Sequence, residues 1–124
     1  METIQNVILG VSGVLLFFVG LSRLSNPQKT FLKNSGINLP QDTSLFNELR
    51  GLSAVMLGAG LIVLLGIILD TFSFTSHMVS VMLFLGFALG RLISFYADGK
   101  PSKQITQGIV FELVLGAANL YCLL

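Results

Sequence analysis

The chain has 124 residues, of which 53% are hydrophobic and 10% charged, with a formal net charge of +1 and a mean hydropathy of +0.85. Soluble domains carry about a quarter charged residues, so this composition indicates an integral membrane protein. The few basic residues are scattered without interleaved aromatics, so nucleic acid is not an expected partner. The single cysteine, Cys122, excludes an intramolecular disulfide, a CxxC redox pair and a thiolate metal cluster.

Four apolar stretches are near or above the ~20 residues that a membrane-spanning helix requires. We therefore predict an all-α fold, an integral membrane four-helix bundle, with residues 1–124 forming a single transmembrane domain. The helices are expected at about residues 4–24, 44–69, 74–97 and 105–124.

A short helix is predicted over residues 27–34, within the first connection. It begins with an Asn-Pro step, which is typical of a helix start, and Gly36 is a stop signal. Phe31 and Leu32 could enter the membrane interface while the two lysines of the segment face lipid headgroups. The alternative is an ordinary loop segment, and the sequence leaves both open.

The basic residues predict the orientation in the membrane. The second connection, residues 70–76, contains none of them. By the positive-inside rule the first and third connections are cytoplasmic and both termini lie outside. The basic residues in or next to those two connections are Arg23, Lys29, Lys33, Arg50, Arg91, Lys100 and Lys103.

Three charged residues lie inside apolar segments: Arg50, Arg91 and Glu112. Each is six or seven residues from the expected cytoplasmic end of its helix, which at ~1.5 Å per residue is roughly 10 Å deep. A lone charge at the bilayer centre costs on the order of 2.5 to 3.5 kcal/mol, so we expect the three to meet as an inward-facing cluster. Two arginines against one acid leave a positive charge, which Glu48 or Asp98 could balance.

The third connection strengthens this prediction for two of the residues. Gly99 suits a helix C-terminus and Pro101 prevents its continuation, so the last two long helices should be close antiparallel neighbours. Arg91 precedes that turn by about as many residues as Glu112 follows it, so the hairpin brings them to matching depth.

Small residues at four-residue spacing predict the faces where helices pack closely. On the last helix, two glycines, Glu112 and Asn119 form one stripe, which we expect to face the bundle interior. The predicted packing residues are Ala54, Gly58, Gly86, Gly90, Gly108 and Gly116.

Two roles fit the predicted charge cluster. In one, Glu112 accepts hydrogen bonds from Arg91, Arg50 or both, and the cluster only fastens three helices in register. In the other, the surplus positive charge holds an anionic lipid or a quinone-like headgroup from the cytoplasmic leaflet. The aromatic residues that could line the apolar part of such a site are Phe46, Phe87, Phe95 and Tyr96.

The leading functional prediction is a small membrane accessory or binding protein that is not an enzyme and needs no metal or cofactor. The only histidine, His77, is expected in the membrane interface, far from the charge cluster, and no nucleophile with its base stands out. The alternative is a proton-coupled small-molecule transporter acting as an oligomer, because a membrane carboxylate beside arginine also suits a proton relay. The expected partners are membrane lipids and a second copy or another membrane subunit.

Three segments carry a resemblance that spans nearly the whole chain. They are Phe46-Asn47-Glu48-Leu49-Arg50-Gly51, then Ala88-Leu89-Gly90-Arg91-Leu92-Ile93-Ser94 running on to Asp98-Gly99-Lys100-Pro101-Ser102, and Phe111-Glu112-Leu113. This pattern resembles a bacterial family of small four-span membrane proteins of unknown function, and is broadly similar to DoxX-like proteins. The resemblance implies a four-helix bundle in a bacterial inner membrane, with Arg50, Arg91 and Glu112 at matching positions. It implies no activity, and the lack of cysteine pairs and haem-ligand histidines argues against direct redox chemistry.

Overall fold

The computed structural model describes residues 2–124, and every regular element in that range is helical. Four of the helices are long and apolar enough to cross a membrane, which confirms the predicted all-α four-helix class and makes the chain a small multi-pass membrane protein. The helices are α1 (Glu2–Ser25), α2 (Pro27–Ser35), α3 (Thr43–Ile68), α4 (Ser73–Asp98) and α5 (Lys103–Leu123), with the short 3₁₀ helix η1 (Asp70–Phe72) between α3 and α4.

Local chemistry explains where the helices begin and end. The Asn26 side chain accepts a hydrogen bond from the backbone of Lys29 at the start of α2, and Asp42 caps α3 in the same way. Gly36 ends α2 with φ at 69°, and Gly99 follows α4 with φ at 105°. Both backbone conformations favour glycine, so these turns are set by the residues at those positions.

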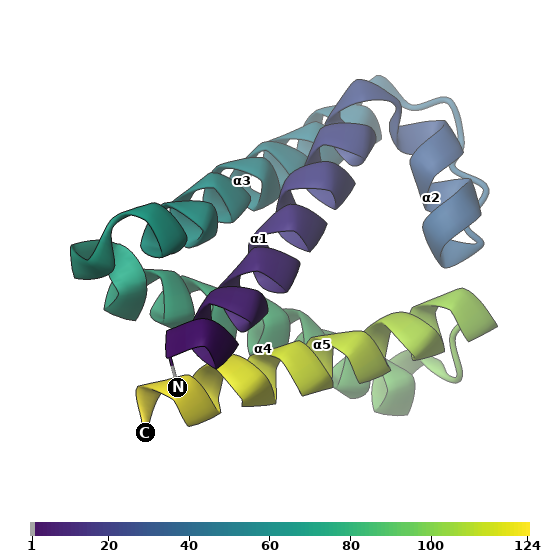
Figure 1. Cartoon of the computed structure of the whole chain (residues 1–124). Coiled ribbons are helices and arrows are strands. Elements are labelled where there is room, and N and C mark those ends of the chain that lie inside the picture. The colour runs from purple at the N-terminus through teal and green to yellow at the C-terminus, as the bar shows by residue number, and fades with distance from the viewer. Residues whose placement is uncertain (1) are drawn as a thin grey trace.

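The long helices form two antiparallel pairs, α1 with α3 and α4 with α5 (Figure 1). The pairs lie close together at the end of the bundle that holds both termini, which we call the narrow end. They diverge toward the opposite, wide end, where α2 lies between the end of α1 and the start of α5. The molecule is therefore splayed, with most of its tight packing within each pair and at the narrow end.

Two glycines allow the backbones of α1 and α3 to come into direct contact. A Cβ atom on Gly20 would lie 2.6 Å from the backbone nitrogen of Leu57, and one on Gly60 would lie 2.6 Å from that of Phe17. Neither space would accept a methyl group without moving a helix. This is the close contact of small residues that is typical of membrane helix pairs.

Most of the residues predicted to pack against another helix do not do so. A Cβ on Gly58, Gly86, Gly90 or Gly108 would meet nothing within 4 Å, and Ala54 is exposed, so the prediction of close helix contacts is wrong for these five. Gly116 does lie against a neighbouring helix, since a Cβ there would clash with the side chain of Leu85. Spacing assigns small residues to one face of a helix, but the tilt of each pair decides which face meets a neighbour.

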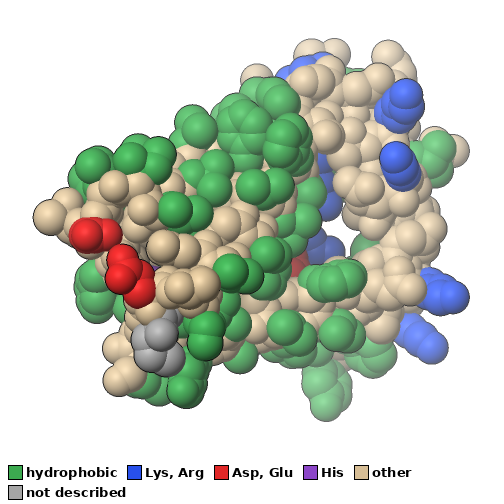
Figure 2. Space-filling model, viewed as in Figure 1, with side chains coloured by type: hydrophobic (Ala, Val, Ile, Leu, Met, Phe, Trp, Pro, Cys, Tyr) green, Lys and Arg blue, Asp and Glu red, His purple; other side chains and the backbone are tan. Residues whose placement is uncertain are grey.

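The core lies toward the narrow end, around Leu9, Leu16, Val63 and Phe84. His77 is also there, only 2% exposed, so its side chain lies among the helices and not on the surface of the bundle. The outer surface of the four long helices carries many exposed large apolar side chains, as expected for a surface that faces lipid (Figure 2).

Candidate functional site

A cavity of about 720 Å³ lies between the two helix pairs on the side of the wide end. Figure 2 shows this hollow with basic and acidic side chains inside it. Its apolar wall comes from α1, α3, α4 and α5, and its polar groups gather near α2 and the start of α5. The apolar lining residues are Val11, Leu15, Leu16, Val19, Met56, Phe84, Phe87, Ile105, Phe111, Val114 and Leu115. The polar ones are Arg23, Lys33, Asn34, Ser35, Arg91, Gln104, Gln107 and Glu112.

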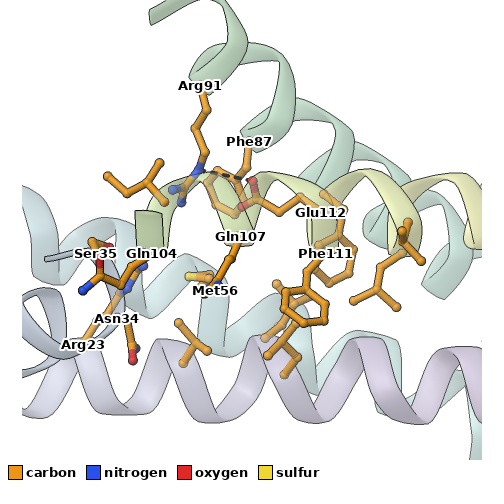
Figure 3. A pocket seen from close by; sticks show the side chains of 18 of the residues that line it. Arg23, Asn34, Ser35, Met56, Phe87, Arg91, Gln104, Gln107, Phe111 and Glu112 are labelled. Atoms are coloured by element: carbon orange, nitrogen blue, oxygen red, sulfur yellow. Dashed lines mark ion pairs between the residues drawn. The ribbon is translucent and has the colours of Figure 1, made fainter. Parts of the chain in front are cut away.

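The Arg91 and Glu112 side chains form an ion pair across the α4–α5 hairpin. Nε of Arg91 lies 3.2 Å from Oε1 of Glu112, and the two side chains are 27% and 12% exposed (Figure 3). The Nε–H bond of Arg91 is not aligned with Oε1, so this contact is an ion pair without a hydrogen bond. Oε1 of Glu112 is therefore buried without a hydrogen-bond donor. The short turn before α5 brings these two charges to the same depth, and their guanidinium and carboxylate face the cavity.

Arg23 is the second cation of the cavity, and it comes from the last turn of α1. Its guanidinium lies over the Phe31 ring, 4.4 Å from the ring centroid, which is a cation–π contact with α2. Arg91 repels its charge and Glu112 attracts it, but the carboxylate pairs with Arg91. Nε of Arg23 is buried without a hydrogen-bond partner. Among residues 2–124, Arg23 has no carboxylate of its own.

Arg50 does not join the cluster, so the prediction that it would meet Glu112 is wrong. It is exposed, and its guanidinium donates a hydrogen bond to the backbone carbonyl of Leu24. That carbonyl belongs to the last turn of α1, where carbonyls lack a partner within the helix. Glu48 is exposed on α3, and Asp98 accepts a hydrogen bond of 2.8 Å from Ser94 at the end of α4. Neither lines the cavity.

Helix α2 closes part of the wide end. The Ser102 hydroxyl donates a hydrogen bond of 2.6 Å to the Ser35 carbonyl, which ties the C-terminus of α2 to the start of α5. Gly36 lies against the Gln104 side chain. In Figure 3, Asn34, Ser35 and Gln104 lie together beside Arg23. The cavity is therefore bordered by the segment that the sequence predicted only as an interfacial helix or loop.

Sequence reasoning missed Arg23 because it stands at a helix end, where an arginine ordinarily marks only orientation. The signal was present in Phe31, an aromatic residue that the fold of α2 places beneath it. Of the four aromatics predicted to line a site, Phe87 does so, whereas Tyr96 is 93% exposed and Phe46 and Phe95 lie outside the lining. Phe84 and Phe111 take their place.

Within residues 2–124, no three His, Cys, Asp or Glu side chains gather as metal ligands would. Comparison with curated proteins found no match, and comparison with solved structures found none either. The sequence does match one protein family over residues 4–123, which is nearly the whole chain. The chain belongs to this family, DUF4345, whose description is a domain of unknown function.

Proposed function

We propose that this protein is a non-enzymatic binding protein that holds an anionic amphiphile within the membrane. The observation that carries the proposal is Arg23, a cavity-facing cation whose Nε is buried without a hydrogen-bond partner. Three cations, Arg23, Lys33 and Arg91, line the cavity with one carboxylate, Glu112, so its polar end has a surplus of two positive charges. An anion would supply the missing counter-charge.

The rest of the cavity suits the apolar part of such a molecule. The volume of about 720 Å³ lies within the range of ligand-binding pockets, and most of the lining is aliphatic or aromatic. The amides of Gln104 and Gln107 also line the cavity and can donate hydrogen bonds to a headgroup. A phosphate or carboxylate headgroup near Arg23, with its chain along the apolar wall, fits this arrangement.

The orientation of the site follows the charge pattern. The wide end carries the basic residues in Figure 2, and the positive-inside rule assigns that end to the cytoplasmic face. We therefore place the headgroup at the depth of the cytoplasmic leaflet, in a bacterial inner membrane. In this proposal the Arg91–Glu112 pair orients the headgroup and fastens α4 to α5.

Native mass spectrometry of gently extracted protein tests the proposal. Wild type and Arg23→Gln should first be compared for co-purified molecules. Each protein should then be stripped and offered phosphatidylglycerol, oleate and phosphatidylcholine separately. We expect wild type to retain an anionic amphiphile and Arg23→Gln to lose at least tenfold in affinity for it. The two anionic probes distinguish a phosphate headgroup from a carboxylate.

Arg50→Gln is the matched control, because it removes the same charge at the same end of the molecule but outside the cavity. This variant should bind like wild type. If wild type takes up none of the three probes, or if Arg23→Gln binds the anionic ones as tightly as wild type does, the proposal is wrong. The ion pair would then only fasten the helices.

A further inference from the structure

A second polar centre lies at the narrow end, away from the charged cavity. It joins three helices through Ser12 on α1, His77 on α4 and Asn119 on α5, all at most 2% exposed. Nδ1 of His77 lies 2.8 Å from Oδ1 of Asn119. Nδ2 of Asn119 donates to the Ser12 hydroxyl at 3.0 Å and to the Leu115 carbonyl at 2.8 Å. We call these three side chains the Asn119 junction.

The hydrogen bonds determine where the histidine proton is. A backbone carbonyl can only accept, so the Asn119 atom that faces Leu115 must be the amide nitrogen. The amide oxygen therefore faces His77, and an oxygen needs a donor, so Nδ1 carries the proton. Nε2 of the neutral ring is then a bare lone pair. It is buried and has no partner among the described residues.

A buried acceptor without a partner is costly, and such groups call for an explanation. No other role in the packing requires an imidazole here, since an amide side chain could also donate to Asn119. What distinguishes histidine is that its second nitrogen can take up a proton. An ionisable side chain in the interior of a membrane bundle is itself a reason to expect a functional site.

A hollow of about 390 Å³ also lies at the narrow end. It is lined by Glu2, Gln5, Asn6, Gly66, Asp70 and Ser73. Ser73 stands one helical turn before His77 on α4, and Gly66 lies against Ser76, the neighbour of His77. The hollow therefore comes within about one helical turn of His77 along α4. The charged cavity lies on the other side, where its lining includes Leu16, one turn after Ser12, and Leu115, one turn before Asn119.

We propose that His77 is a proton-binding site reached from the narrow end. A protonated ring would place an Nε2–H donor and a positive charge in the buried interior, where the described residues offer no acceptor. The protonated form is therefore stable only when the junction opens and water reaches Nε2. Proton binding and opening of the junction are linked, because a ligand favours the state that binds it better.

Other ionisable groups also lie near this end. They are Glu2 on α1, Asp70 after α3, and Tyr121 and Cys122 on α5, while α3 has no ionisable residue between Arg50 and its end. None of them is hydrogen-bonded or ion-paired to His77 in the described chain. Glu2 and Asp70 line the hollow and are exposed.

Solid-state NMR on protein labelled with ¹⁵N-histidine in lipid bilayers tests this directly, because the chain has one histidine and both ring signals belong to it. Near neutral pH we expect a protonated Nδ1 and an unprotonated Nε2. On acidification the Nε2 signal should move reversibly to the protonated position while circular dichroism shows intact helices. A protonated Nε2 at neutral pH, or a ring that stays neutral until the protein unfolds, would overturn the proposal.

His77→Gln is the matched variant, since its side-chain amide can donate to Asn119 but cannot titrate. Amide hydrogen exchange near Ser12 and Asn119, corrected for the intrinsic pH dependence, should rise in wild type on acidification. The rise should be absent in His77→Gln. An equal rise in the variant would assign the opening to Glu2, Asp70 or another group. The NMR measurement on wild type decides the proposal even if the variant fails to fold.

Discussion

At the scale of single residues, the side chains that matter most for stability and binding are those whose polar atoms lie inside the bundle. Asn119 makes three hydrogen bonds there and is fully buried. Arg23 and Arg50 lie near the same end of the molecule, but their environments differ. One lies in the cavity with a buried, unpartnered nitrogen, and the other is exposed and caps a helix end.

Asn119→Leu should destabilise the protein by about 1 to 3 kcal/mol, because it leaves the buried Nδ1–H of His77 without an acceptor. The free energy of unfolding, measured by titration with SDS in mixed micelles, checks this. Asn47→Leu is the control, since Asn47 is exposed near the start of α3. It should change the stability by less than ~0.5 kcal/mol. Equal effects of the two substitutions would show that the junction adds no stability.

At the scale of helices, the α1–α3 pair depends on backbone contact at Gly20 and Gly60, whereas the α4–α5 pair is joined by a short turn and by the Arg91–Glu112 contact. Two glycines on α3 differ sharply in environment although they are two residues apart. Gly60 faces the backbone of α1, and Gly58 faces open space.

Gly60→Ala should therefore destabilise the protein by about 1 to 3 kcal/mol, since the added methyl group would force α1 and α3 apart. Gly58→Ala should be neutral or stabilising by up to about 1 kcal/mol, because alanine is the better helix former and meets no neighbour. The same SDS titration measures both. A larger loss in Gly58→Ala than in Gly60→Ala would show that α1 and α3 pack on a different face.

At the scale of the whole molecule, the two helix pairs meet at the narrow end and separate around the cavity, and charge follows the same axis. Glu2 and Asp70 lie at the narrow end, and the lysines of the first and third connections lie at the wide end (Figure 2). A membrane-embedded molecule with this distribution has a definite expected orientation.

In a Cys122→Ser background, Asp70→Cys should react with a membrane-impermeant maleimide added to intact cells. Lys100→Cys should react only after the cells are permeabilised. This result is expected because the basic connections stay on the cytoplasmic side. Both sites are exposed, so differences in burial do not decide the outcome. Labelling of Lys100→Cys alone in intact cells would reverse the orientation and move the headgroup end of the cavity to the other leaflet.

The sequence by itself determined what depends on local chemistry. Apolar length defines the four long helices, Asn26, Gly36 and Asp42 set the ends of the helices in and around the first connection, and a short turn brings Arg91 and Glu112 to one depth. These features need no knowledge of how distant helices meet, because the interactions involved lie within one helix or one hairpin.

Only the tertiary structure decided which faces of the helices meet. The rotation of each helix about its axis depends on contacts such as that of Gly60 with α1, and lipid accepts an exposed glycine or alanine at no cost. That rotation turned Arg50 outward, placed Arg23 in the cavity and buried His77 against Asn119. A hydrophobic pattern in a membrane helix cannot carry this information, because lipid and protein interior are equally apolar.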